Sequence, residues 1–151
     1  MNLSSILTVE CIQAPLEASE KQEAINELVD LLAKNDKVKD PESLKDAVWS
    51  REQTRTTGIG HGLAIPHGKC DCIQNPTLAI GRPSSPMDFE SMDSQPVELI
   101  VLLASPTSST REHIEALAQV SRIMNNPSFR EVIYKADDAE EIYNLLVEQG
   151  G

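Results

Sequence analysis

The longest apolar run in the chain consists of six consecutive aliphatic residues, 99–104. It lies between Pro96 and Pro106, and prolines on both sides of a short run mark the ends of a regular segment. A membrane-spanning helix needs about 20 apolar residues, so this run is far too short to be one. A continuous aliphatic run of this length is typical of a buried strand. We therefore expect a strand over residues 97–104, inside a sheet that has helices against it.

Other segments carry weaker strand signals. Residues 77–82 are rich in aliphatic side chains and lie between Pro76 and Pro83, which predicts a second buried strand. A third strand is expected near residues 11–15. Residues 54–68 hold four of the seven glycines and show no helical periodicity, so they predict a turn-rich segment that leads into a short extended piece at 63–66.

Helical patterns occupy much of the remaining chain, and each begins at a capping signal. The expected starts are Ser19 with Gln22 in a capping box, Asp40 before Pro41, Ser109 with Glu112 in a capping box, Asn126 before Pro127, and Asp137 with Glu140. The expected buried stripes are Ile25, Leu28, Val29 and Leu32; Leu44, Ala47 and Val48; Ile114, Leu117, Ala118, Ser121 and Met124; and Ile142, Leu145 and Leu146. The second helix is expected to end near Gln53, and residues 149–151 to be frayed.

Strands and helices interleave along the chain, without an internal repeat and without a Gly/Ser-rich or proline-rich linker. The length of 151 residues is close to the commonest size of one domain. The fold is therefore predicted to be α/β: a single domain over residues 1–151 with a mixed β-sheet flanked by helices. The pattern leaves the order of the strands open.

Charge restricts the partners of this chain. There are 24 acidic and 13 basic side chains, which give a formal net charge of −11. Such a charge repels the phosphates of nucleic acids and anionic membrane surfaces, so we expect no nucleic-acid partner. Any phosphate site in so acidic a chain has to be built from local donors, such as backbone amides, a helix start or a few arginines.

The cysteines and the amino terminus bear on the compartment. The cysteines, Cys11, Cys70 and Cys72, are odd in number, and the first residues do not follow a signal-peptide pattern. We therefore expect a cytoplasmic, reduced protein that is not itself membrane-spanning.

His67 is the first candidate for chemistry. Pro66 favours an extended backbone at Ile65, and Gly68 leaves the far side of the imidazole unshielded. An unperturbed imidazole titrates near pH 6.5, so a neutral ring nitrogen is available as a nucleophile towards phosphorus. The alternative is a structural histidine in a loop.

His113 is the second candidate, because it lies in the first turns of the helix that follows Ser109. Unpaired amides and the helix dipole favour an anion there. The alternative is a surface residue between Glu112 and Glu115.

Basic residues and glycines flank the two histidines in sequence. Arg51, Arg55, Lys69 and Arg111 could hold phosphate oxygens, or could simply be solvated. Gly58, Gly60 and Gly62 could form an amide nest, but their spacing matches neither the dinucleotide fingerprint nor the Walker loop.

A metal site is the competing interpretation of the same region. His61, His67, Cys70 and Cys72 lie within a dozen residues, and all four side chains are possible zinc ligands. Their spacing lacks the C-x2-C or H-x3-H arrangement that suits tetrahedral closure. A non-catalytic metal-binding or protein-interaction module built on these residues is therefore the alternative function.

The run from Thr57 to Lys69, T-G-I-G-H-G-L-A-I-P-H-G-K, resembles the signature of the type 2 enzyme IIA domains of the bacterial phosphoenolpyruvate phosphotransferase system, in the fructose, mannitol and nitrogen-related branch. The resemblance extends to residues 3–7, to the Arg51-Glu52 pair, to residues 95–100 and to His113 at a helix start, so it covers essentially the whole chain. One departure is His61, where the nitrogen-related members usually have asparagine.

This resemblance implies an enzyme IIA type 2-like fold and a phosphotransferase that carries a phosphoryl group on His67. The group would come from HPr or an HPr-like carrier, and would pass to an enzyme IIB in sugar uptake or serve phosphorylation-dependent regulation of a target protein. By motif position, His113 and Arg51 support the phosphoryl group, and Thr57, Gly58 and Gly68 are candidates for a phosphate loop. Neither a metal nor another cofactor is required.

Overall fold

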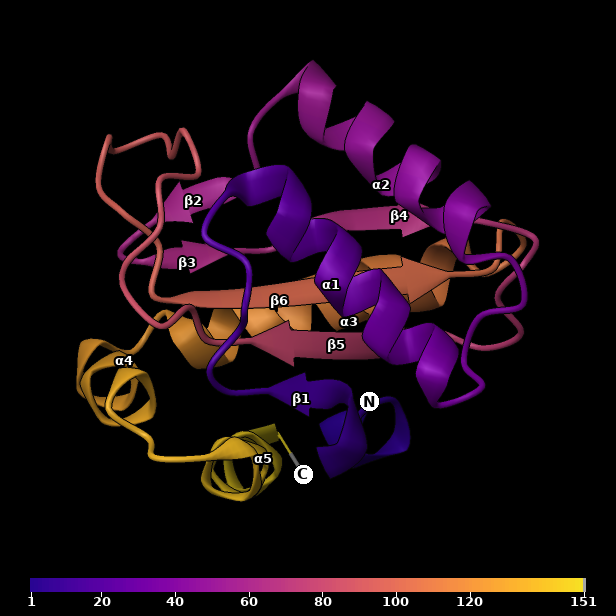
Figure 1. Cartoon of the computed structure of the whole chain (residues 1–151). Helices are drawn as coiled ribbons and strands as arrows, with labels where there is room; N and C mark the ends of the chain where they lie inside the picture. The colour runs from indigo at the N-terminus through magenta and orange to yellow at the C-terminus, as the bar shows by residue number, and fades with distance from the viewer. Residues whose placement is uncertain (151) are drawn as a thin grey trace.

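The computed structural model describes residues 1–150 as a central sheet between two layers of helices (Figure 1). The strands are β1 (Ile12–Gln13), β2 (Gly58–Gly60), β3 (Leu63–Ala64), β4 (His67–Lys69), β5 (Thr77–Gly81) and β6 (Leu99–Ser105). The helices are α1 (Lys21–Lys34), α2 (Pro41–Thr54), α3 (Thr110–Met124), α4 (Pro127–Tyr134) and α5 (Ala139–Gly150), with short 3-10 turns at Leu3–Ser5 and Val9–Cys11. The predicted single α/β domain with a mixed sheet is confirmed.

The sheet is organised around β6, the strand of the long apolar run. The strand order is β1-β5-β6-β3-β2, and β4 also pairs with β6. β5 runs antiparallel to β6, whereas β3 and β4 run parallel to it. β3 meets β6 at Leu99 and Ile100, and β4 meets it further along, where His67 is opposite Leu103. The position of His67 is therefore set by the last residues of β6.

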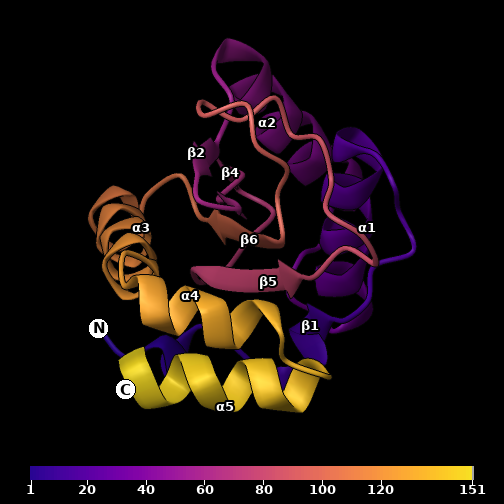
Figure 2. The ribbon, with the colours of Figure 1, turned by 90° about the vertical axis from the view of Figure 1, so that its left-hand side faces the viewer.

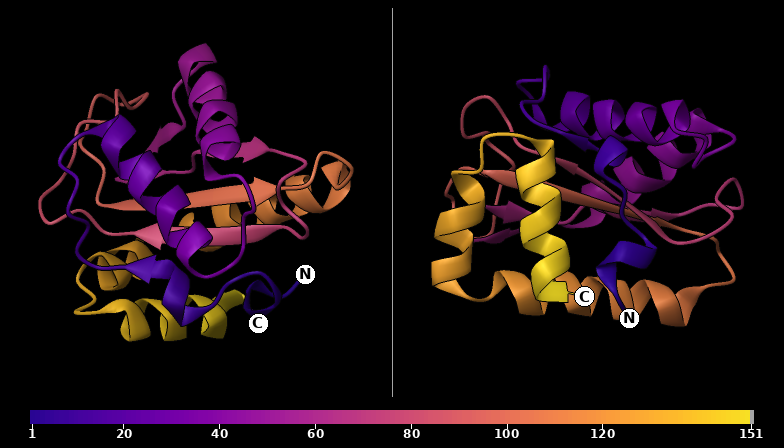
Figure 3. Two further views of the ribbon diagram at one scale, coloured as in Figure 1. Left: turned by 45° about the vertical axis from the view of Figure 1, so that its right-hand side comes forward. Right: turned by 90° about the horizontal axis from the view of Figure 1, so that it is seen from below.

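Alternation along β6 explains why both of its faces are covered. Leu99, Val101 and Leu103 pack into a core with α3, α4 and α5, whereas Ile100, Leu102 and Ala104 pack into a second core with α1 and α2. Successive strand residues point to opposite faces, so an uninterrupted aliphatic run needs apolar neighbours on both sides. Figures 2 and 3 show α1 and α2 on one face of the sheet and α3, α4 and α5 on the other.

The glycine-rich segment contains more strand than the sequence predicted. Residues 54–68 were expected to form turns and one extended piece, but they include β2, β3 and the start of β4. β2 and β3 form a tight antiparallel pair with an irregular register between Gly58 and Gly60. Strands of two or three residues are too short for a two-residue alternation to show in the sequence. They are defined by pairing with neighbouring strands, β3 and β4 with β6 and β2 with β3.

Three helix starts are confirmed, at Asp40, Ser109 and Asn126, and two differ. Asp40 accepts from the N–H of Ser43 before α2, and Asn126 caps α4 in the same way. No capping box forms at Ser19, because α1 begins after Glu20 and the chain ahead of it is held by Glu27, which accepts from the N–H groups of residues 17 and 18.

Ser109 is the residue before α3, as predicted, but the expected capping box does not form there. Asp138, not Asp137, accepts from the N–H of Glu141 at the start of α5. α2 ends at Thr54, one residue from the expected end, and α5 continues through Gly150, so the fraying expected at 149–150 is wrong and Gly151 lies outside the described residues.

The buried stripe of α3 was predicted correctly only in part. Met124 is buried and Leu117 packs partly buried against the core, but Ile114, with an exposed fraction of 60%, and Ala118 and Ser121 are exposed. The residues that face the core are His113, Ala116, Val120, Ile123 and Met124. The buried faces of α1 and α5 are confirmed at Ile25, Leu28, Val29, Leu32, Ile142 and Leu146.

None of the helices in residues 1–150 combines the length and the apolar character needed to cross a bilayer.

Candidate functional site

His67 begins β4 and is half-buried, rather than lying in an open loop. Its Nδ1 lies 2.8 Å from the carbonyl oxygen of Ile65. Because a carbonyl only accepts, Nδ1 carries the proton and Nε2 keeps its lone pair. The short Ile65-Pro66-His67 segment thus selects one tautomer and leaves Nε2 as the ring nitrogen with a free lone pair.

Gly68 allows helix α2 to approach the strand that carries His67. A Cβ atom at this position would lie 3.0 Å from both Cγ2 and the backbone N of Val48. The glycine therefore acts in the packing of β4 against α2, and through it brings the end of α2 towards the imidazole.

His113 lies in the first turn of α3, and its ring faces His67. Its exposed fraction is 4%, so the alternative of a surface residue is wrong. Its Nδ1 lies 2.7 Å from Oγ of Ser105, a fully buried residue at the end of β6. The centroids of the two imidazoles are 5.4 Å apart, with 61° between the ring planes. The structure thus brings together the two histidines that the sequence singled out, and adds Ser105, which sequence reasoning missed.

Both imidazoles are disposed to be neutral at neutral pH. The pKa of His113 is lowered to about 4, mainly by burial, with positive charge at His67 and Lys69 acting in the same direction. Burial also lowers the pKa of His67, with Arg51 and Lys69 acting in the same direction, while the hydrogen bond to Ile65 and the charge of Glu52 oppose it. A neutral ring is the form that can attack phosphorus.

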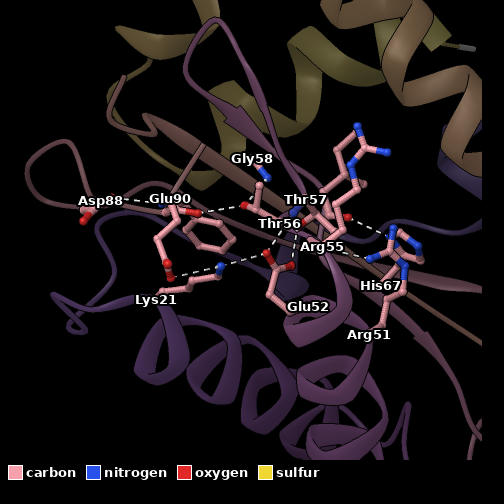
Figure 4. A network of polar contacts seen from close by, with 12 residues as sticks. Lys21, Arg51, Glu52, Arg55, Thr56, Thr57, Gly58, His67, Asp88 and Glu90 are labelled. Carbon is pink, nitrogen blue, oxygen red and sulfur yellow. Dashed lines mark hydrogen bonds and ion pairs between the residues drawn. The ribbon is translucent and has the colours of Figure 1, made fainter. Parts of the chain in front are cut away.

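Of the four basic residues named from the sequence, Arg51 is the one whose position fits best with holding an anion beside His67. It lies in the last turn of α2, and its Nη1 donates to the carbonyl of Arg55 at 3.0 Å. Figure 4 shows its guanidinium beside the imidazole of His67, whereas the guanidinium of Arg55 points away. This contact with Arg55 leaves further N–H groups of Arg51 for an anion.

The other basic candidates differ in what they do. Lys69 is exposed on β4, donates to the hydroxyl of Thr110 at 3.1 Å, and contributes positive charge to both histidines. Arg111 forms an exposed ion pair with Glu115 on its own helix. It is therefore a solvated residue, as its alternative interpretation predicted.

The glycine-rich turn positions other groups instead of presenting free amides. The N–H and hydroxyl of Thr57 both donate to Glu52, and the N–H of Gly58 donates to the hydroxyl of Thr56. A Cβ atom at Gly58 would lie 2.4 Å from Oγ of Ser91. The N–H groups of Thr57 and Gly58 are thus engaged within the protein and Gly68 packs against α2, while a phosphate loop formed by Thr57, Gly58 and Gly68 stays a prediction.

His61 lies on the turn between β2 and β3, apart from the histidine pair. Its N–H donates to Asp93 and its carbonyl accepts from the hydroxyl of Tyr134. The side chain borders a separate hollow together with Arg122 and Arg130.

The geometry does not support the metal-binding alternative. Cys70 and Cys72 are joined to each other in a disulfide, with Cα atoms 5.1 Å apart, so the expectation that all cysteines are reduced is wrong for this pair. Cys11 is free and buried. Across residues 1–150, no three His, Cys, Asp or Glu side chains gather in a way that could hold a metal ion.

Comparison with known proteins identifies this arrangement. Residues 5–149 match the family described as "Phosphoenolpyruvate-dependent sugar phosphotransferase system, EIIA 2". The chain belongs to this EIIA 2 family. The match spans both histidines, Arg51 and the whole sheet, and the predicted resemblance is thereby confirmed.

Relatives of this EIIA 2 chain include proteins of very different length. It is 34% identical over 146 residues to the fructose-specific EIIABC component of Bacillus subtilis, which covers 97% of this chain but only 23% of that protein. It is 31% identical to the fructose-specific EIIA component of Haloferax volcanii, with 97% of this chain and 96% of the relative covered.

Solved structures share the fold. The nitrogen regulatory protein IIA-Ntr of Neisseria meningitidis has a TM-score of 0.87 at 30% identity, covering 94% of this chain and 97% of that one. The enzyme IIA of the mannitol system of Escherichia coli, solved in complex with phosphorylated enzyme IIB, has a TM-score of 0.80 at 21% identity, covering 95% and 99%.

Proposed function

We propose that this EIIA 2 chain is a cytoplasmic phosphocarrier, and that Nε2 of His67 accepts the phosphoryl group from the phosphohistidine of HPr or an HPr-like protein. The observation that carries the proposal is the pair of imidazoles, 5.4 Å apart, each with Nδ1 engaged in a hydrogen bond. Fixed rings and one free ring nitrogen on His67 suit in-line transfer, which depends mainly on positioning and charge.

The transfer step balances without a cofactor. The lone pair of His67 Nε2 forms a bond to phosphorus, the P–N bond of the donor breaks, and the donor imidazole nitrogen keeps that electron pair. As the new bond forms, the ring gains positive charge, and the carbonyl oxygen of Ile65 stabilises this charge by accepting the hydrogen bond from Nδ1–H.

Two side chains are proposed to support the phosphoryl oxygens. Arg51 offers guanidinium N–H groups beside His67. We further propose that the hydroxyl of Ser105, 2.7 Å from Nδ1 of His113, donates to it, which leaves a proton on Nε2 of His113 as a neutral donor. One cation and one neutral donor stabilise the bound group without holding it so tightly that onward transfer fails.

The phosphoryl group is proposed to pass to an enzyme IIB in sugar uptake, or to act as a signal that a target protein reads. Relatives named as fructose-specific EIIA components support the first output, and the likeness to a nitrogen regulatory protein supports the second. Both outputs use the same histidine chemistry.

Intact-mass analysis after incubation with phosphoenolpyruvate, enzyme I and HPr tests the acceptor. We expect one acid-labile phosphoryl adduct on the wild-type chain and none on His67→Ala. Phosphorus NMR of the adduct should assign it to the Nε2 position. Absence of any adduct with a competent donor, or an adduct that persists in His67→Ala, would refute the assignment.

A further inference from the structure

A short series of hydrogen bonds joins the end of α2 to the imidazole of His67 (Figure 4). Glu52 accepts from the N–H of Thr57 at 2.8 Å and from its hydroxyl at 2.5 Å. The carbonyl of Thr57 accepts from the N–H of Ile65 at 3.0 Å. The carbonyl of Ile65 in turn accepts from Nδ1 of His67 at 2.8 Å. Two intervening residues therefore link a buried carboxylate to the ring of the proposed acceptor.

The carboxylate of Glu52 is held in place from more than one side. Its side chain is only 1% exposed, and Nζ of Lys21, the first residue of α1, lies 3.0 Å from Oε2. The same ammonium lies 5.1 Å from the centre of the Phe89 ring. A buried carboxylate is costly unless it is paired and hydrogen-bonded, and here Lys21 and the two donors of Thr57 supply both.

The segment between α2 and β2 has little room to move. The hydroxyl of Thr56 donates to the carbonyl of Phe89 at 2.8 Å and accepts from the N–H of Gly58 at 3.1 Å. The carbonyl of Gly58 accepts from the N–H of Met92. Thr57 lies in the middle of this segment, so its carbonyl is a fixed anchor for Ile65.

We infer that Glu52 is a positioning residue for phosphoryl acceptance. Paired with Lys21, it holds Thr57, and through Ile65 it keeps the ring of His67 oriented with Nδ1 protonated and Nε2 free. Its effect on rate rests on the proposed acceptor role of His67, but its effect on the ring is measurable in the unphosphorylated protein. A buried ion pair that served stability alone would leave the tautomer of His67 unchanged.

Glu52→Gln in the full chain tests the inference. Three donors, the ammonium of Lys21 and the N–H and hydroxyl of Thr57, point at the two carboxylate oxygens of Glu52. Glutamine has only one acceptor oxygen, so its NH2 group would face at least one of these donors and lose that hydrogen bond. Nitrogen NMR of the rings should show one Nδ1–H tautomer of His67 in the wild type, and a mixture with faster proton exchange in Glu52→Gln. With purified phospho-HPr, kcat for acceptance should fall about ten- to a hundredfold, with KM changed less than about twofold.

A second ion pair between the same helices provides the matched control. Nζ of Lys45 on α2 lies 2.8 Å from Oδ1 of Asp30 on α1, and the Asp30 side chain is 61% exposed. Asp30→Asn removes an α1–α2 ion pair without touching the bonds to Thr57. This variant should keep the tautomer of His67 and the acceptance rate of the wild type.

Thr57 provides a second route if Glu52→Gln does not fold. Thr57→Val removes only the hydroxyl that donates to Glu52, whereas Thr57→Ser keeps a hydroxyl. Thr57→Val should shift the tautomer and slow acceptance in the same direction, and Thr57→Ser should lose less of both.

The outcomes separate this inference from the proposed function. A folded Glu52→Gln with the wild-type Nδ1–H signal and rate would overturn the inference, as would unfolding of both Glu52→Gln and Thr57→Val while Asp30→Asn folds. A wild-type chain that forms no adduct would refute the acceptor function, whereas a change in the Nδ1–H signal of His67 in Glu52→Gln would still show that Glu52 orients the ring.

Discussion

The charge state of His113 illustrates how burial prepares a single residue for its role. Its pKa of about 4 means that the ring is neutral over the whole physiological range. Burial lowers this pKa mainly because it removes water from the protonated ring. A new negative charge nearby would stabilise the protonated ring and so raise the pKa. A phosphoryl group on His67, whose ring centre is 5.4 Å away, would place such a charge beside it.

We predict that phosphorylation of His67 raises the pKa of His113 from about 4 towards its ordinary value. The phosphoryl dianion favours the protonated ring, and stabilises it most because the site is buried. Ring NMR titrations of the free and phosphorylated chain measure the change. An unchanged pKa of His113 on phosphorylation would contradict the proposed contact.

At the scale of elements, the close approach of α2 to β4 assembles the site. Arg51 comes from the last turn of α2 and His67 from the first residue of β4, and Gly68 meets Val48 where the two elements touch. Arg51 and His67 were both predicted from the sequence, but Gly68 was expected only to leave the imidazole unshielded. Only the packing of the helix on the strand shows that the glycine governs the distance between them.

Gly68→Ala should therefore both destabilise the fold and slow phosphoryl acceptance. The added Cβ would meet the backbone and side chain of Val48 at 3.0 Å, so α2 has to move away from β4. Overpacking of this kind costs about 1–3 kcal/mol of unfolding free energy, measurable by urea denaturation. Val48→Ala in the same chain removes one of the two contacts and should recover part of the loss. A Gly68→Ala variant with unchanged stability and rate would exclude this packing role.

Helix α3 shows where local pattern is insufficient. Its start after Ser109 was predicted, but its orientation was not, because two stripes of apolar residues lie side by side on the helix and only packing against β6 selects one. The selected stripe carries His113 into the core beside Ser105. The choice of face therefore decides whether the second histidine belongs to the site.

At the scale of the whole molecule, the depressed histidine pKa values link stability to pH. His113 titrates at about 4 in the folded chain and near 6.5 when unfolded, so between these values the unfolded chain binds more protons. Stability contributed by the neutral ring is complete above pH 6.5 and is lost as the pH falls towards 4. His67 acts in the same direction, because its pKa is also lowered.

We predict that the difference in unfolding free energy between the wild type and His113→Ala shrinks as the pH falls from 6.5 to 4, by at most about 3 kcal/mol. At neutral pH the variant should be less stable by about 1–3 kcal/mol, because it leaves the buried hydroxyl of Ser105 without its partner. Urea denaturation of both chains across this pH range measures the difference. A difference that stays constant with pH would show that His113 is not buried as a neutral ring.

The sequence by itself determined the class of fold, the buried strands and most of the helices, and it singled out His67 as the candidate acceptor. Each of these features depends on a pattern of a few neighbouring residues: an aliphatic run, a capping residue, the Pro-His-Gly segment and the family motif around it. The tertiary structure alone decided the strand order, the burial of His113, the tautomer of His67, and the link from Glu52 through Thr57. Each of these depends on contacts between elements, and the free energy of such contacts is set by burial and hydrogen bonding that exist only once the chain has folded.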